Sequence, residues 1–266
     1  KKEPKFAGRG FGSINGLADS FLQTFHLLSK MSYASNAENL AGSAYFDLSI
    51  PLLFNGEQPG SFGAAGATAT AYQAGGFVGD VRQGGSCNCE VYVLTPHCNG
   101  THTECVGHIA EQRISISQKT PPPFLPATLL SVAPVAAKDC DESYDPAPAA
   151  NDLLVTQRAL EQAAARFPNR SFYKALVIRT LPNDSDKKCR DYSSQEPPFF
   201  SKEAMQWIRA QGVEHLLVDF PSVDKANDEG KLTNHRIFWN EPPRGQPVGG
   251  LSNHTITEMI FAPNEA

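Results

Sequence analysis

The second half of the chain alternates between short apolar runs and segments with apolar residues at helical spacing. The runs ALVIRT (175–180) and HLLVDF (215–220) have the length and apolar content of buried strands. Between them, SKEAMQWIRAQ (201–211) has a helical pattern, with Ser201 placed to cap its first turn and Gly212 placed to end it. Strands that alternate with helices are typical of an α/β core.

A further helix is predicted over LLVTQRALEQAAARF (153–167), with Asn151 or Asp152 as its capping residue. The proline-rich segment 120–126 excludes a helix and indicates a rigid connection. The polar segment 141–152 is typical of a loop.

The first half has fewer regular patterns. YFDLSIPL (45–52) alternates apolar and polar residues up to Pro51, which predicts a strand. EVYVLT (90–95) and RISISQ (113–118) are further strand candidates. Residues 55–86 are rich in Gly and Ala, a composition that favours loops.

Residues 1–44 are polar and Gly-rich apart from one segment with helical spacing, 17–28. We expect an N-terminal extension that covers its own core or an arm that packs on a neighbour. The domain itself is predicted to span residues 45–266.

The composition excludes several classes of protein. The 266 residues are 41% hydrophobic, which is enough for a sizeable core and excludes general disorder. The net charge of −5 lacks the basic character that nucleic-acid binding requires. No apolar stretch is long enough to span a bilayer, so we expect neither nucleic acid nor membrane as a partner.

The six cysteines are too few for a disulfide scaffold and favour a cytoplasmic location. Secretion stays open, because four sequons at Asn99, Asn169, Asn183 and Asn253 would accept glycans in an exported chain.

The segment PHCNGTHTECVGH (96–108) concentrates metal-ligand residue types: Cys98, His102, Glu104 and His108. In an extended segment His102 and Glu104 share a face, and in a helical segment Glu104 and His108 are neighbours. An extended chain would carry Cys98 and His108 too far apart for one ion, so the chain must fold back. Together these residues predict a metal site.

The same segment resembles the signature of the cyclase family of metal-dependent hydrolases, which includes kynurenine formamidase and isatin hydrolase. The similarity extends to FDLSIPL (46–52), ALVIRT (175–180) and FFSKEAMQWIRAQGVEHLLVDFPSVD (199–224). It implies an α/β fold with a swivelling β/β/α domain, a mixed sheet with flanking helices, and a homodimer or homotetramer.

The resemblance also implies a ligand set. His102, Glu104 and His108 fall on metal-binding positions of the signature, where Glu104 replaces an Asp. Strict spacing puts Cys98 on the first ligand position, whereas His97 lies one residue earlier and needs an altered backbone. We therefore expect Cys98 as the ligand and His97 in a supporting position.

Two further positions follow from the C-terminal part. The segment NHR (234–236) is similar to the family's distal His segment, and TITEMI (255–260) to its closing Glu segment. His235 and Glu258 are therefore candidate metal ligands or proton carriers together with His108, and His254 competes with them.

The implied activity is hydrolysis of a small-molecule amide, formamide, lactam or lactone by a metal-activated water. Cys98, His102 and Glu104 would hold one divalent ion, with His108, His235 and Glu258 holding a second ion or moving protons. A thiolate ligand favours zinc, with manganese as the second choice.

Two other interpretations stay open. The site could bind a metal or a ligand without catalysis, for example as a zinc knot of Cys87, Cys89, Cys98 and Cys105. Alternatively, Cys98 could act as a nucleophile activated by His102.

Overall fold

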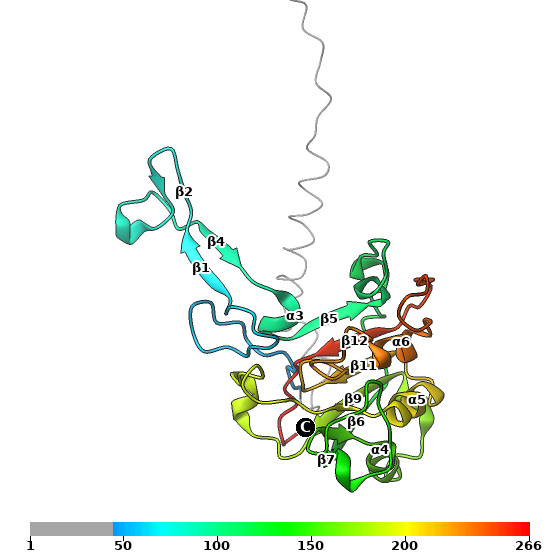
Figure 1. The fold of residues 1–266 in the computed structure, drawn as a ribbon. Coiled ribbons are helices and arrows are strands. Elements are labelled where there is room, and N and C mark those ends of the chain that lie inside the picture. The colour runs from blue at the N-terminus through cyan, green and yellow to red at the C-terminus, as the bar shows by residue number, and fades with distance from the viewer. Residues whose placement is uncertain (1–44) are drawn as a thin grey trace, which may run out of the picture. The chain divides into compact units, whose positions relative to one another are not determined.

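The computed structural model describes residues 45–266, of which residues 46–266 form one compact unit (Figure 1). The extension expected over residues 1–44 lies outside the described residues. A five-stranded sheet forms the centre of the unit. In spatial order its strands are β5 (His102–Cys105), β12 (Thr255–Glu258), β11 (His215–Val218), β9 (Ala175–Thr180) and β6 (Ala127–Val132). The last four are parallel and β5 is antiparallel to β12, which confirms the predicted α/β class with a mixed sheet.

Three helices connect the parallel strands. They are α4 (Gln157–Ala164) between β6 and β9, α5 (Lys202–Ala210) between β9 and β11, and α6 (Thr233–Trp239) between β11 and β12. α5 packs against both α4 and α6. Alternate strand residues such as Leu176 and Ile178 meet the helices, while Val177 packs with Leu48 and Ile260 in a second apolar cluster. Helical crossovers thus bury the parallel strands.

Shorter elements surround this core. Strands β1 (Thr68–Ala71) and β4 (Glu90–Val93) form an antiparallel ribbon, continued by β2 (Gln73–Ala74) and β3 (Phe77–Val78). A small sheet contains β10 (Phe199–Phe200), β8 (Leu153–Val155) and β7 (Val135–Ala136), and α3 (Pro96–Asn99) is a single helical turn. The 3₁₀ turns are η2 (Val81–Gln83), η3 (Val106–His108), η4 (Ile116–Gln118), η5 (Ala137–Asp139), η6 (Arg170–Tyr173) and η7 (Ser185–Lys188). None of the helices in the described part of the chain has the length and apolarity that a membrane crossing requires.

Several predicted elements are confirmed. β9 has the predicted bounds, and β11 and β4 lie within the predicted strands 215–220 and 90–95. α5 lies within 201–211, where the Ser201 hydroxyl accepts a hydrogen bond from the Ala204 amide. Gly212 follows with a φ of 76°, a conformation that glycine adopts at helix ends without steric cost.

The predicted helix over 153–167 is wrong in its first part. Residues Leu153–Val155 form β8, which pairs with β10 and β7 instead of starting the helix. The cap is neither Asn151 nor Asp152 but Thr156, whose hydroxyl accepts from the Ala159 amide. Tertiary pairing of three apolar residues therefore overrides the helical pattern.

The strands predicted over 45–52 and 113–118 are absent. In the first, Asp47 accepts hydrogen bonds from the Ser49 amide and hydroxyl, and the Ile50 amide donates to the Thr101 hydroxyl rather than to a strand. In the second, the Ser115 hydroxyl caps the turn η4. In both segments side-chain hydrogen bonds take the place of sheet pairing.

A buried ion pair ties the ends of β9 and β11 together. The Lys187 ammonium lies 2.8 Å from Asp219 Oδ2 and donates to both the carbonyl and the hydroxyl of Thr180. The Asp219 carboxylate also accepts from the Thr180 amide and hydroxyl. Because every charge in this cluster has a partner, the structure tolerates its burial.

Replacing Lys187 with Met should reduce the free energy of unfolding by about 3–5 kcal/mol, because Asp219 would remain buried without its counter-charge. Urea denaturation followed by circular dichroism measures this loss. The matched control is Lys174→Met, which breaks an exposed pair with Glu214 and should cost less than about 1 kcal/mol. Equal losses in the two variants would contradict the assigned role of Lys187.

Candidate metal centre

Two neighbouring strands present the first three polar side chains of the site. His102 and Glu104 are alternate residues of β5 and point to one face, as the sequence predicted. Glu258 of β12 is the cross-strand partner of His102, and its Oε2 lies 3.3 Å from His102 Nε2. The His102 Nδ1–H donates to the Gly100 carbonyl at 3.0 Å. This hydrogen bond turns Nε2 toward the other site residues.

The turn α3 brings His97, and not Cys98, to these strands. His97 Nδ1 lies 3.2 Å from Glu104 Oε2, and the His97 ring packs against the rings of His102 and His108 at centroid distances of 4.7 and 4.5 Å. Successive residues of a helical turn point in directions about 100° apart, so Cys98 faces away from the site. Its thiol is buried, and burial raises the pKa of Cys98.

The structure thus brings His97 to the His/Glu cluster in the place where the sequence led us to expect Cys98. The expectation assumed strict signature spacing through residues 97–101. The helical turn instead absorbs one extra residue between His97 and Gly100. The sequence held a signal for this turn, because Pro96 after Thr95 is typical of a helix start.

His108 reaches the same carboxylate through the turn η3. Its Nδ1 lies 3.3 Å from Glu104 Oε2, and its side chain is 29% exposed. The turn depends on Gly107, because a Cβ at this position would lie 2.3 Å from the Ile114 carbonyl oxygen. Glu104 and His108 are thus neighbours as predicted, but through the end of β5 and a 3₁₀ turn rather than within one helical segment.

His235 approaches from α6 on the other side of Glu104. Its Nε2 lies 2.7 Å from Glu104 Oε1 and 3.9 Å from Glu258 Oε1, which makes His235 and Glu258 part of the same cluster. His254, the competing candidate, instead packs against the ring of Phe238 at 5.5 Å.

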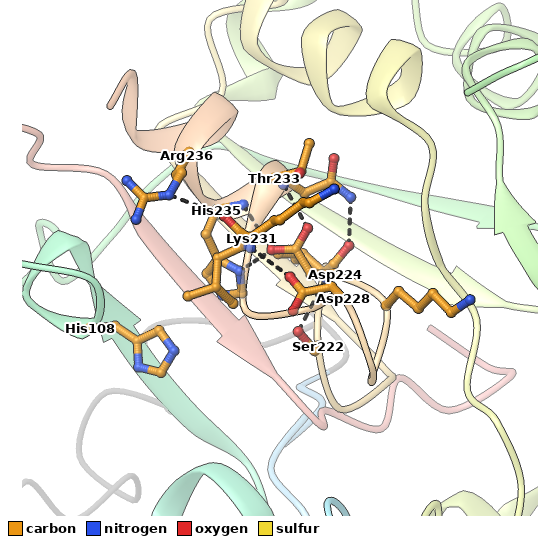
Figure 2. A network of polar contacts seen from close by, with 12 residues as sticks. His108, Ser222, Asp224, Asp228, Lys231, Thr233, His235 and Arg236 are labelled. Carbon is orange, nitrogen blue, oxygen red and sulfur yellow. Dashed lines mark hydrogen bonds and ion pairs between the residues drawn. The ribbon is translucent and has the colours of Figure 1, made fainter. Parts of the chain in front are cut away.

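Asp224 holds His235 in this orientation and was not among the candidate residues. Its Oδ2 lies 2.5 Å from His235 Nδ1, and the amides of Asn234 and His235 donate to the same carboxylate (Figure 2). The Tyr144 hydroxyl also donates to it. The Asp224 amide in turn donates to Ser222. The signal in the sequence was the position of Ser222–Asp224 after a parallel strand, where ligand clefts of α/β proteins lie.

Two buried atoms of the cluster have no hydrogen-bond partner in the described structure: His102 Nε2 and Glu104 Oε2. Their neighbours lie at 3.2–3.3 Å without hydrogen-bond geometry. Unsatisfied buried polar atoms are costly, and imidazole nitrogens and carboxylate oxygens are metal donors. Two sets of donor atoms lie within 4.8 Å of one another, His97–His102–Glu104 and Glu104–His108–His235. The donor chemistry therefore fits a divalent metal ion, and Glu104 belongs to both sets.

The charges of the cluster shift each other's pKa. Burial raises the pKa of Glu104, but the charge and hydrogen bond of His235 outweigh it, so the net shift is downward. Burial opposes the charged form of His235, yet Glu104 and Asp224 raise its pKa well above the usual value. Burial and the charge of Glu104 raise the pKa of Glu258. Burial lowers the pKa of His108 to about 4 despite its contact with Glu104.

A pocket of about 220 Å³ leads to this cluster. Its lining includes five residues of the cluster: His97, Glu104, His108, His235 and Glu258. The remaining lining residues are Phe62, Pro221, Ser222, Lys225, Ala226, Asp228 and Leu232. The site is therefore open to a small molecule that has both polar and apolar parts.

The cysteines do not form a competing metal site. All six are free, and Cys87 and Cys89 are exposed while Cys98 and Cys105 are buried. Among residues 45–266, the clusters with metal-ligand spacing contain only His and Glu. The geometry therefore gives no support to a four-cysteine zinc knot.

The chain is similar in fold to several solved structures. Isatin hydrolase A from Labrenzia aggregata, solved with benzyl benzoate, is 12% identical over 87% of this chain and 88% of its own, with a TM-score of 0.50. A predicted metal-dependent hydrolase from Bacillus stearothermophilus is 11% identical over 83% and 84% of the two chains, with a TM-score of 0.48. No curated protein matches the sequence.

A family comparison covers the strands and loops that carry most of the cluster. Residues 46–225 match the sequence profile of the Cyclase family, described as "Putative cyclase". The matched range is more than half of the chain and includes His97, His102, Glu104, His108 and Asp224. The chain therefore belongs to the Cyclase family.

Proposed function

We propose that this protein is a metal-dependent hydrolase that cleaves an amide, formamide, lactam or lactone in a small molecule. The buried Glu104 carboxylate, with imidazoles on both sides and a pocket leading to it, carries this proposal. A closed structural metal site would not need such a pocket, so the pocket favours catalysis over a purely structural ion.

The proposed ligands of the first ion are His97, His102 and Glu104. Glu104, His108 and His235 form the set for a second ion, and the Glu104 carboxylate is shared between the two. Glu258 supports both sets, because its two oxygens lie 3.3 Å from His102 Nε2 and 3.9 Å from His235 Nε2.

Zinc is the proposed metal, with manganese as the second choice. With His97 instead of Cys98 in the ligand set, no thiolate is present to favour zinc. The site still offers four imidazoles, however, and imidazole ligands suit zinc. A bound divalent ion would lower the pKa of a water molecule and polarise a substrate carbonyl.

The chain's own residues would handle protons. When no second ion is bound, His108 is free to act as a base. It lies partly exposed at the pocket, and its low pKa keeps it neutral near pH 7, so its imidazole can accept a proton from the attacking water. Glu258 has a raised pKa and can hold a proton for the leaving amine or alcohol. Asp224 keeps the Nδ1–H of His235 engaged, so that only Nε2 faces Glu104.

The pocket limits the substrate to a small molecule. Phe62 and Leu232 supply apolar lining, while Lys225 supplies a cation next to it. Isatin and N-formylkynurenine are therefore reasonable first substrates, each with a planar apolar part next to a cleavable carbonyl group.

Replacing His97 or His102 with Ala should abolish binding of the first ion, because each removes one of three donors. Metal content is measured by inductively coupled plasma mass spectrometry after dialysis. Cys98→Ser is the matched control on the same helical turn and should keep the full metal content. Loss of metal in Cys98→Ser with retention in His97→Ala would reverse the assignment.

Chelation should remove the activity, and added zinc should restore it. A panel of amides, lactams and lactones, including the two substrates above, is assayed before chelation, after chelation and after metal addition. Turnover that persists in metal-free protein would contradict a metal-dependent mechanism. In that case, iodoacetamide labelling of Cys98 would test the cysteine nucleophile instead.

The metal-free protein should lose stability as the pH rises above about 6.5. The pKa of His235 is higher in the folded chain than its value of 6.5 in the unfolded chain. Protonated His235 therefore stabilises the fold fully at pH values below 6.5, and this stabilisation is lost as the pH rises past the folded-state pKa. Urea denaturation in EDTA measures this slope. The slope should be shallower in His235→Gln, and an identical slope would show that His235 is not the titrating group.

A further inference from the structure

The small sheet of β10, β8 and β7 contributes no residue to the metal centre, but it holds a side chain that reaches toward the centre. Leu154 of β8 and Phe199 of β10 are paired in the sheet and form a separate buried cluster with Tyr144. The rings of Tyr144 and Phe199 meet edge to face, with 4.9 Å between their centroids. This packing restricts the direction in which the Tyr144 ring points.

The chain on both sides of Tyr144 is anchored as well. The amide and hydroxyl of Ser143 donate to the carboxylate of Glu203 in the first turn of α5. The Asp145 carbonyl accepts from the hydroxyl of Thr233, the first residue of α6. Tyr144 is therefore held between the first turns of two helices, α5 and α6.

The hydroxyl of Tyr144 joins two residues of the loop after β11. It donates to Asp224 Oδ1 at 2.7 Å and accepts from the Lys225 amide at 3.3 Å. Because an amide can only donate, the hydroxyl oxygen accepts from Lys225 and the hydroxyl proton is left for Asp224. Burial and the charge of Asp224 raise the pKa of Tyr144, so the hydroxyl keeps this proton. Tyr144 is therefore a hydrogen-bond donor with one fixed acceptor.

Four hydrogen bonds occupy the carboxylate of Asp224. Oδ2 accepts from the amide and the Nδ1–H of His235 (Figure 2). Oδ1 accepts from the Asn234 amide at 2.6 Å and from Tyr144. A carboxylate has about four acceptor sites, so all of them are used. Three of the donors belong to α6, and Tyr144 is the one donor that comes from elsewhere in the described structure. It therefore ties the carboxylate to a part of the fold outside the helix that Asp224 orients.

We propose that Tyr144 is a positioning residue of the metal centre, because its hydroxyl fixes Asp224 and Asp224 in turn fixes the imidazole of His235. The inference rests on the metal-dependent function proposed above. The Nε2 atom of His235 lies 2.7 Å from Glu104 Oε1, so a rotation of the ring would take one donor out of the set that these two residues form with His108. Removal of the support behind a ligand histidine typically weakens metal binding by about 10–100-fold. The small sheet would thus serve the metal centre without supplying a ligand.

Tyr144→Phe tests the inference, because it removes the hydroxyl and keeps the ring in its cluster. Zinc affinity is measured by competition with a chelating dye, and His235→Gln identifies the ion that His235 holds. Tyr144→Phe should weaken the binding of this ion about tenfold or more. Equal zinc affinity in the wild type and Tyr144→Phe would overturn the inference.

Tyr173→Phe is the matched control. Tyr173 is likewise buried, and its hydroxyl donates to the carbonyls of Ala164 and Phe167, which belong to neither donor set. Both variants should lower the urea concentration at the midpoint of unfolding, but Tyr173→Phe should keep the zinc affinity of the wild type. An equal loss of zinc affinity in the two variants would point to general loosening of the fold and reject the assigned role.

The route through Asp224 is tested in Asp224→Asn, which should itself bind the ion more weakly. If Tyr144 acts through this carboxylate, adding Tyr144→Phe to Asp224→Asn should cause no further loss of zinc affinity. An additive loss would contradict the route.

The outcomes separate the inference from the proposed function. A wild-type protein that binds no zinc would contradict both. Zinc binding that survives fully in His235→Gln would reject the second donor set and the inference with it, while the first set would stand. If Tyr144→Phe does not fold, the wild-type hydroxyl proton of Tyr144 decides, because a buried hydrogen bond should slow its exchange enough for detection by NMR. A rapidly exchanging hydroxyl proton would overturn the inference.

Discussion

The burial of one carboxylate governs the organisation of this protein. Glu104 is almost inaccessible to solvent, and an isolated buried carboxylate would cost several kcal/mol. His97 and His108 approach its Oε2, and His235 bonds to its Oε1. Each imidazole comes from a different element, so the fold must bring α3, η3 and α6 together around one strand. The arrangement is useful only if positive charge is held there, by protonated imidazole or by metal.

The sheet topology explains how these elements meet. In the five-stranded sheet β5 is the one antiparallel strand, and it lies beside β12 at one edge. Its position puts His102 opposite Glu258 and leaves Glu104 facing the first turn of α6. Asp224 lies in the loop after β11 and accepts from the backbone of that same turn, so one carboxylate both caps α6 and orients His235. The position of α6 and the orientation of the His235 ring are thus coupled through Asp224.

The sequence predicted the features that depend on local chemistry. The apolar run 175–180 predicts β9, and the helical pattern behind Ser201 predicts α5. The alternation of side chains along a strand predicts that His102 and Glu104 point to the same face. The errors occur where long-range contacts decide. Leu153–Val155 has a helical pattern but finds strand partners. The placement of His97 rather than Cys98 at the cluster is a different case, because it depends on one local helical turn that strict signature spacing does not include. Asp224 acts through His235, a contact between residues eleven positions apart that spacing alone does not reveal.

The length of the acid at residue 104 matches the position of one imidazole. A glutamate carries its carboxylate one methylene farther from β5 than an aspartate would. The helical turn before Gly100 places His97 where that side chain ends, with Nδ1 3.2 Å from Oε2. A shorter side chain at residue 104 would withdraw the carboxylate from His97 and His235 together, and strict spacing would present Cys98 instead. Glu104 and the turn α3 are therefore best understood as one structural unit, because the side-chain length of residue 104 fits the place at which α3 presents the His97 imidazole.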